Sequence, residues 1–113
     1  MSENEHNEVL LQLILTHPQA RPLIDMLLAR EQGLFFTVAD IQGHGQPSER
    51  LSVHEQVAGA QRKVSVDIEI EANHVDALLK EITERLTTET IYYRVLPILR
   101  QGCLHCDQDF ASH

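Results

Sequence analysis

The most reactive side chains of the 113-residue sequence, Cys103, His105 and Cys106, lie within four positions near its C-terminal end. Two thiolates and an imidazole at this spacing suit Zn²⁺ or Cu(I). They supply only part of a closed tetrahedral shell, so His113, His44 or a second subunit would have to complete it. Two incidental thiols in a polar tail are the open alternative. A redox role is disfavoured, because these cysteines do not open a helix after the first strand as thioredoxin-like pairs do.

A second group of candidate residues, Gly43, His44, Gly45 and Gln46, follows the expected second strand. Glycine has no Cβ, so the backbone here can approach a ligand closely. His44 is either a ligand or polar contact, or a solvated loop histidine. The surrounding connection, residues 42–60, is long and rich in Gly, Pro, Ser and His, and connections of this length in compact domains are commonly functional.

Charge and composition exclude several classes of function. The chain has 17 acidic and nine basic residues, a formal charge of −8, so nucleic-acid binding and attraction to an anionic membrane are not expected. No apolar run approaches the roughly 20 residues that cross a bilayer, and the N-terminus is acidic where a secretory signal is basic. We therefore expect a cytoplasmic protein without membrane insertion. Its parts are a flexible N-terminus (1–7), one domain (8–100) and a C-terminal tail (101–113).

Hydrophobic periodicity predicts the elements that must position these residues. Four segments are predicted to be strands. Residues 9–15 are apolar on both faces, residues 34–41 and 90–99 are rich in β-branched and aromatic side chains, and residues 62–71 alternate strictly between apolar and polar. A helix is expected to begin near Pro22, because a proline deep inside a helix lacks its donor, and to end at Gly33 in the left-handed conformation. Asn73 is the expected N-cap of a second helix that reaches Leu86.

The resulting order is strand, helix, strand, strand, helix, strand. It predicts an α+β, ferredoxin-like βαββαβ domain: a four-stranded antiparallel sheet with two helices on one face. The other face stays open in a single chain. Leu10, Ile14 and Phe35 are candidates for that face, and an apolar patch of this kind favours an oligomer.

Catalysis is not expected. Acyl phosphatases on the ferredoxin-like fold carry a glycine-containing anion loop after the first strand, whereas residues 16–21 contain no glycine. The sequence also has no nucleophile-elbow motif. The chain is therefore predicted not to be an enzyme.

Several stretches point to a family of binding proteins rather than enzymes. They are the Gly43, His44, Gly45 stretch, the Glu55, Gln56, Val57 and Gly59 stretch, and residues 93–97 of the last strand. With the long connection between strands two and three, the chain resembles the PII-like (GlnB-like) signalling superfamily over residues 8–100. It is most similar to an uncharacterised PII-like family often encoded beside heavy-metal efflux pumps.

The resemblance implies a homotrimeric regulatory or sensor protein. A small effector, commonly an adenine nucleotide, would bind between subunits and reorder the long loop, which contacts a partner such as a regulated membrane transporter or efflux protein. By position, Gly43, His44, Gly45 and Gln46, together with Arg94 and Arg100, would form the effector site.

The phosphate loop that precedes the last strand in nucleotide-binding members is missing, because residues 86–91 contain no glycine or lysine and add Glu89. The effector is therefore left open as a nucleotide or a transition metal, Zn or Cu. The alternative function is a metal-binding protein that uses Cys103, His105 and Cys106 in heavy-metal handling.

Overall fold

A computed structural model describes residues 7–44, 61–86 and 90–106 of the chain. In chain order the elements are β1 (Glu8–Leu15), α1 (His17–Leu28), β2 (Phe36–Gly43), β3 (Gln61–Glu71), the 3₁₀ turn η3 (Ala72–His74), α3 (Val75–Arg85) and β4 (Tyr92–Pro97). Several parts of the chain lie outside the described ranges. They include Gly45 and Gln46, most of the 42–60 connection, and nearly all of the N-terminus expected to be flexible. No helix within the described ranges is long and apolar enough to cross a membrane.

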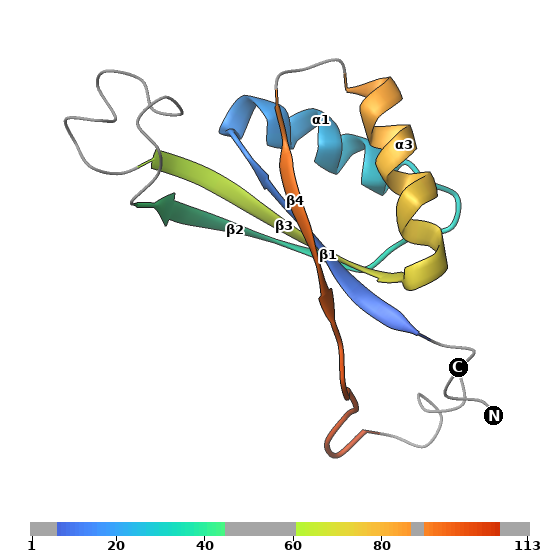
Figure 1. Ribbon diagram of the computed structural model, residues 1–113. Helices are drawn as coiled ribbons and strands as arrows, with labels where there is room; N and C mark the ends of the chain where they lie inside the picture. Colours follow the sequence, from blue (N-terminus) through green and yellow to red (C-terminus); the bar gives the residue numbers. More distant parts are fainter. Residues whose placement is uncertain (1–6, 45–60, 87–89, 107–113) are drawn as a thin grey trace.

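The four strands form one antiparallel sheet in the order β2-β3-β1-β4 (Figure 1). The predicted order of strands and helices is confirmed, and the architecture is an α+β sheet consistent with the ferredoxin-like fold. Because β1 and β3 occupy the centre, β2 and β4 are the two edges. Residues of β2 and β4 are therefore separated by two strands within one chain.

The core lies on one face of the sheet, where both helices pack. Alternate residues of β1 are buried there, and each faces a buried partner on β3, such as Leu11 opposite Ile68 and Leu13 opposite Val66. The same cluster contains the inward stripes of the two helices, namely Leu23, Met26 and Leu27 from α1 and Val75, Leu78 and Ile82 from α3. Since one cluster joins both helices to the sheet, the prediction that they share a face is confirmed.

The opposite face of the sheet is not covered by any described element. Leu10 and Ile14 of β1 are half-buried there, and their cross-strand neighbours on β4 are Leu96 and Tyr92. Phe35, just before β2, is 64% exposed. These are the apolar residues expected for this face, which we call the open face.

Helix α1 begins earlier than the sequence indicated. It starts at His17 rather than near Pro22, because Thr16 and Gln19 form a complete capping box: the Gln19 backbone N–H donates to Thr16 Oγ1 (3.3 Å), and the Thr16 N–H donates to Gln19 Oε1 (2.9 Å). Pro22 lies inside the helix. The absent N–H of Pro22 removes a single bond near the helix start, and the reciprocal cap offsets that loss.

Two further helix boundaries differ from the prediction. The last residue of α1 is Leu28, and its C-cap, Ala29, has right-handed backbone angles, so Gly33 does not end the helix. The core-facing stripe stops at Leu27, and a longer helix would bury nothing more. Asn73 lies inside η3 rather than at the N-cap of α3, which is His74.

Candidate functional site

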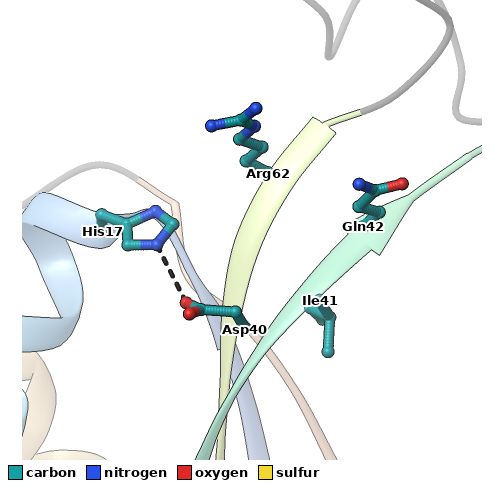
Figure 2. A pocket seen from close by; sticks show the side chains of 5 residues that line it. All are labelled: His17, Asp40, Ile41, Gln42 and Arg62. Atoms are coloured by element: carbon teal, nitrogen blue, oxygen red, sulfur yellow. Dashed lines mark hydrogen bonds and ion pairs between the residues drawn. The ribbon is translucent and has the colours of Figure 1, made fainter.

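A polar hollow of about 300 Å³ lies between the start of α1 and the adjoining ends of β2 and β3. His17, Asp40, Ile41, Gln42 and Arg62 line it (Figure 2). Ordinary ligand pockets fall in the range of about 300–1,000 Å³, so the hollow is large enough for a small metabolite or part of a nucleotide.

Strand register and the cap of α1 bring these side chains together. Asp40 and Gln42 are two positions apart on β2 and so share a face of the sheet. Gln42 is directly opposite Arg62 on β3. His17 is the first residue of α1, and the capping box fixes the point at which the helix begins.

A hydrogen bond between His17 and Asp40 closes one side of the hollow. His17 Nε2 lies 3.0 Å from Asp40 Oδ1, and the two side chains are 56% and 84% exposed. A pair this exposed contributes about 0–1 kcal/mol to stability. In the structure it places an imidazole and a carboxylate side by side at the rim of the hollow.

Arg62 brings a positive charge to the opposite side. It forms no ion pair with any residue in the described ranges, and its side chain is exposed. A guanidinium offers a rigid set of N–H donors that matches carboxylate or phosphate. The hollow therefore combines a guanidinium, an amide, an imidazole and a carboxylate, which is suited to an anionic ligand that also carries hydroxyl or amino groups.

The hollow is at the base of the long connection. β2 ends at Gly43 and β3 begins at Gln61, and these two residues pair with each other. The connection leaves the sheet and returns to it directly beside Gln42 and Arg62. A Cβ added at Gly43 would meet Gln61 at 3.9 Å, an ordinary contact, so nothing in the described chain requires glycine here.

The effector residues expected from sequence lie near opposite edges of the sheet, some by β2 and some by β4. Gly43 and His44 are at the end of β2, and His44 is exposed. Arg94 is on β4, opposite Gln12, and Arg100 lies beyond that strand. Since β2 and β4 are opposite edges of the sheet, one chain does not bring the two arginines to Gly43 and His44.

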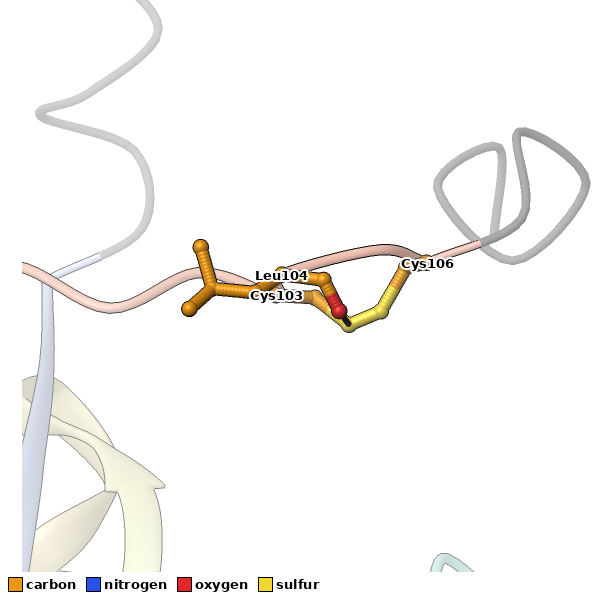
Figure 3. The surroundings of a disulfide bond; sticks show 3 residues. All are labelled: Cys103, Leu104 and Cys106. Carbon is orange, nitrogen blue, oxygen red and sulfur yellow. Dashed lines mark hydrogen bonds between the residues drawn. A yellow bond between two sulfur atoms is a disulfide. The ribbon is translucent and has the colours of Figure 1, made fainter.

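The candidate metal ligands lie in an exposed segment after β4. A disulfide joins Cys103 and Cys106, whose Cα atoms are 5.7 Å apart (Figure 3). Sequence alone predicts free thiols, and sulfurs in a disulfide do not act as thiolate ligands. Within the part of the chain that the structure describes, no group of three or more His, Cys, Asp or Glu side chains is placed to hold a metal ion. His105 is thus not gathered with the two sulfurs into a metal cluster.

Sequence reasoning missed His17 and Asp40 as site residues. In the sequence, His17 belongs to a helix-start pattern, Thr16 to Gln19, and a histidine in the first turn of a helix indicates only a local structural role. The available signal was the alternation Phe36, Val38, Asp40: the first two face the same side as the core, and a carboxylate next in that series is out of pattern.

Fold and site together define a small α+β domain with a four-stranded antiparallel sheet and a polar hollow at the base of its β2–β3 connection. The chain belongs to the family described as "Protein of unknown function (DUF3240)", which matches residues 5–105. It is similar to the crystal structure of a DUF3240 family protein from Shewanella baltica OS155, with a TM-score of 0.67 and 22% sequence identity over 87% of this chain and 97% of that one. At this identity the likeness establishes the fold. No curated protein matches.

Proposed function

We propose that the chain is a cytoplasmic, PII-like regulatory protein whose β2–β3 connection responds to a small effector and contacts a partner protein. The observation that supports this most directly is the hollow at the base of that connection, lined by Arg62, which forms no ion pair with a described residue. By its resemblance, the partner is a regulated membrane transporter or efflux protein.

A ligand in the hollow would act on both ends of the connection at once. Gln42 is next to the last residue of β2, and Arg62 is the second residue of β3. A ligand that contacts both side chains ties the two strand ends together. Such a ligand shifts the connection toward arrangements compatible with the bound state, in proportion to its difference in affinity between states.

The proposal includes a homotrimer packed through the open face. Leu10, Ile14 and Tyr92 leave apolar surface there, and burying such surface favours association. In a threefold arrangement, Arg94 and Arg100 of one copy could approach Gly43 and His44 of the next, which a single chain does not allow. Light scattering tests this assembly, and a monomer at micromolar concentration would contradict it.

Calorimetric titration of the full chain tests the effector site. The ligands are ATP, ADP and cyclic dinucleotides, and the diagnostic variant is Arg62→Ala. Lys63→Ala is the matched control: it removes the same charge one position away, on the opposite face of β3. We expect saturable binding of at least one nucleotide, weakened about tenfold or more by loss of the charge-assisted contact of Arg62 and unchanged in the control.

Two results would contradict the effector proposal. The first is the absence of saturable heat with every nucleotide. The second is equal weakening in both variants, since this would indicate a general loss of positive charge rather than a contact in the hollow.

A second candidate function is metal binding through Cys103, His105 and Cys106. The observation in its favour is the short turn that brings the two sulfurs together. Titration with Zn²⁺, Cu(I) and Ni²⁺ tests it, with the Cys103→Ser/Cys106→Ser variant as control. Equal metal binding by that variant would rule out the cysteines as ligands.

A further inference from the structure

The Cys103–Cys106 segment is a tight turn rather than an extended tail. Its end residues have Cα atoms 5.7 Å apart, inside the limit of about 7 Å that defines a β-turn and the range of about 4.4–6.8 Å found for disulfides. The third residue, His105, has φ of 60°, in the left-handed region that favours glycine. The backbone of the turn therefore already holds the two cysteines at bridging distance.

A contact with the domain fixes where this turn lies. Gln101, two residues before Cys103, donates from Nε2 to Glu8 Oε1 at 2.9 Å, which holds the segment beside the start of β1. Residues 101–106 are all exposed. Small thiols, disulfides and metal ions in solution can therefore reach both sulfurs.

We propose that Cys103 and Cys106 form a redox-gated Cu(I) site, in which the dithiol binds the cation and the disulfide excludes it. This rests on the second candidate function above and adds its regulation. The gate follows from chemistry, because a thiolate is a metal ligand and a disulfide sulfur is not. Metal–sulfur bonds of about 2.3 Å allow the sulfurs to be at most about 4.6 Å apart, which side-chain rotation within the same turn can provide.

Cu(I) fits this turn better than Zn²⁺ does. Both cations accept thiolates, but structural zinc sites are almost always tetrahedral with a full set of protein ligands. In the described part of the chain, no third and fourth ligand gather around the cysteine pair. Cu(I) accepts a lower coordination number, so two thiolates are sufficient to hold it.

The redox step is a thiol–disulfide exchange. A small dithiol attacks the Cys103–Cys106 bond and gives it two electrons, while its own two thiols become a disulfide and their protons pass to the released cysteines. Binding of Cu(I) then displaces the two thiol protons. In the reverse direction, a small-molecule disulfide takes the two electrons back, reforms the protein disulfide and leaves as two thiols.

Competition with the Cu(I) chelator bicinchoninate tests the proposal on the full chain. The reduced protein, prepared with a dithiol and desalted without oxygen, is expected to withdraw about one Cu(I) per chain. Protein oxidised with a small disulfide should withdraw none, and renewed reduction should restore binding. Cys103→Ser/Cys106→Ser should fail in every state. Leu104→Ala, within the same turn, is the matched control that should bind like the parent chain.

Different failures have different meanings. If the reduced chain withdraws no more Cu(I) than the double variant, the metal site and its gate are both wrong. If oxidised and reduced chains bind equally, with the disulfide confirmed by mass, the gate is wrong while metal binding stands. If treatment with the small disulfide leaves the two thiols free or links separate chains, the gate is likewise wrong.

Discussion

Gln19 is the residue whose removal most directly tests how the site is positioned. Its side chain is buried (8% exposed) and makes two hydrogen bonds to residues within the described ranges: Oε1 accepts from the Thr16 N–H at 2.9 Å, and Nε2 donates to the Thr90 carbonyl at 3.3 Å. The first bond closes the capping box that starts α1, and the second ties this helix to the chain just before β4. Gln19→Ala removes both bonds without adding bulk.

The expected loss follows from those two bonds. Each intramolecular hydrogen bond contributes about 0.5–1.5 kcal/mol, so Gln19→Ala should lower the free energy of unfolding by about 1–3 kcal/mol. At about 2 kcal/mol, the midpoint of thermal unfolding should fall by about 8–16 °C for a domain of this size. Urea unfolding gives the free energy directly, and the slope with denaturant should stay unchanged because the variant exposes the same surface when it unfolds.

Gln32→Ala is the matched control for this measurement. Gln32 is exposed after the end of α1 and makes no hydrogen bond to a described residue, so the control should stay within about 0.5 kcal/mol of the parent chain. A loss for Gln19→Ala no larger than for the control would refute the capping argument. A loss well above 3 kcal/mol would show that contacts of Gln19 beyond these two hydrogen bonds determine the cost.

Four further substitutions test other parts of the fold by urea unfolding. Leu13→Ala, at a core position that is 1% exposed, should cost about 2–5 kcal/mol; a cost below 1 kcal/mol would mean that the core collapses around the gap. Pro22→Ala should raise stability, since it restores a helical N–H at an interior position, and a destabilised variant would contradict this. Arg30→Ala should cost more than Arg85→Ala, although both arginines pair with Glu81, because Arg30 is less exposed; the reverse order would contradict that account.

The strongest hydrophobic patterns predicted the fold correctly. Strict alternation of Val64, Val66, Ile68 and Ile70 fixed both the position and the buried face of β3. The stripe of α3 was equally clear, since Val75, Leu78 and Ile82 recur at helical spacing. In these segments, local periodicity and tertiary burial agree, so the sequence alone was sufficient.

Helix boundaries were harder to predict than strands, because neighbouring residues favoured different helix starts. The penalty for Pro22 argued for a late start of α1, while the Thr16 and Gln19 pair argued for an early one. Gln19 also bonds to Thr90, more than 70 positions further along the chain, and no local pattern reports that contact. This tertiary hydrogen bond favours a start of α1 at His17 rather than near Pro22.

The candidate site could be predicted only in part for the same reason. The position of the long connection followed from composition. The pairing of His17 with Asp40 depends on the helix start and on the register of β2 against β3. A one-residue shift in either element would turn one of these side chains away.

The hollow and the cysteine turn lie at opposite ends of β1, one of the two central strands. β1 begins at Glu8, which binds Gln101 of the turn segment, and its last residue, Leu15, is two positions before His17. Eight residues of extended strand separate these ends by about 25 Å. Perturbations this far apart with no shared partner normally act additively, so a single chain should bind an effector equally well in the dithiol and disulfide states. If oxidation of the cysteines does change effector affinity, the simplest explanation is coupling between copies of the chain rather than within one.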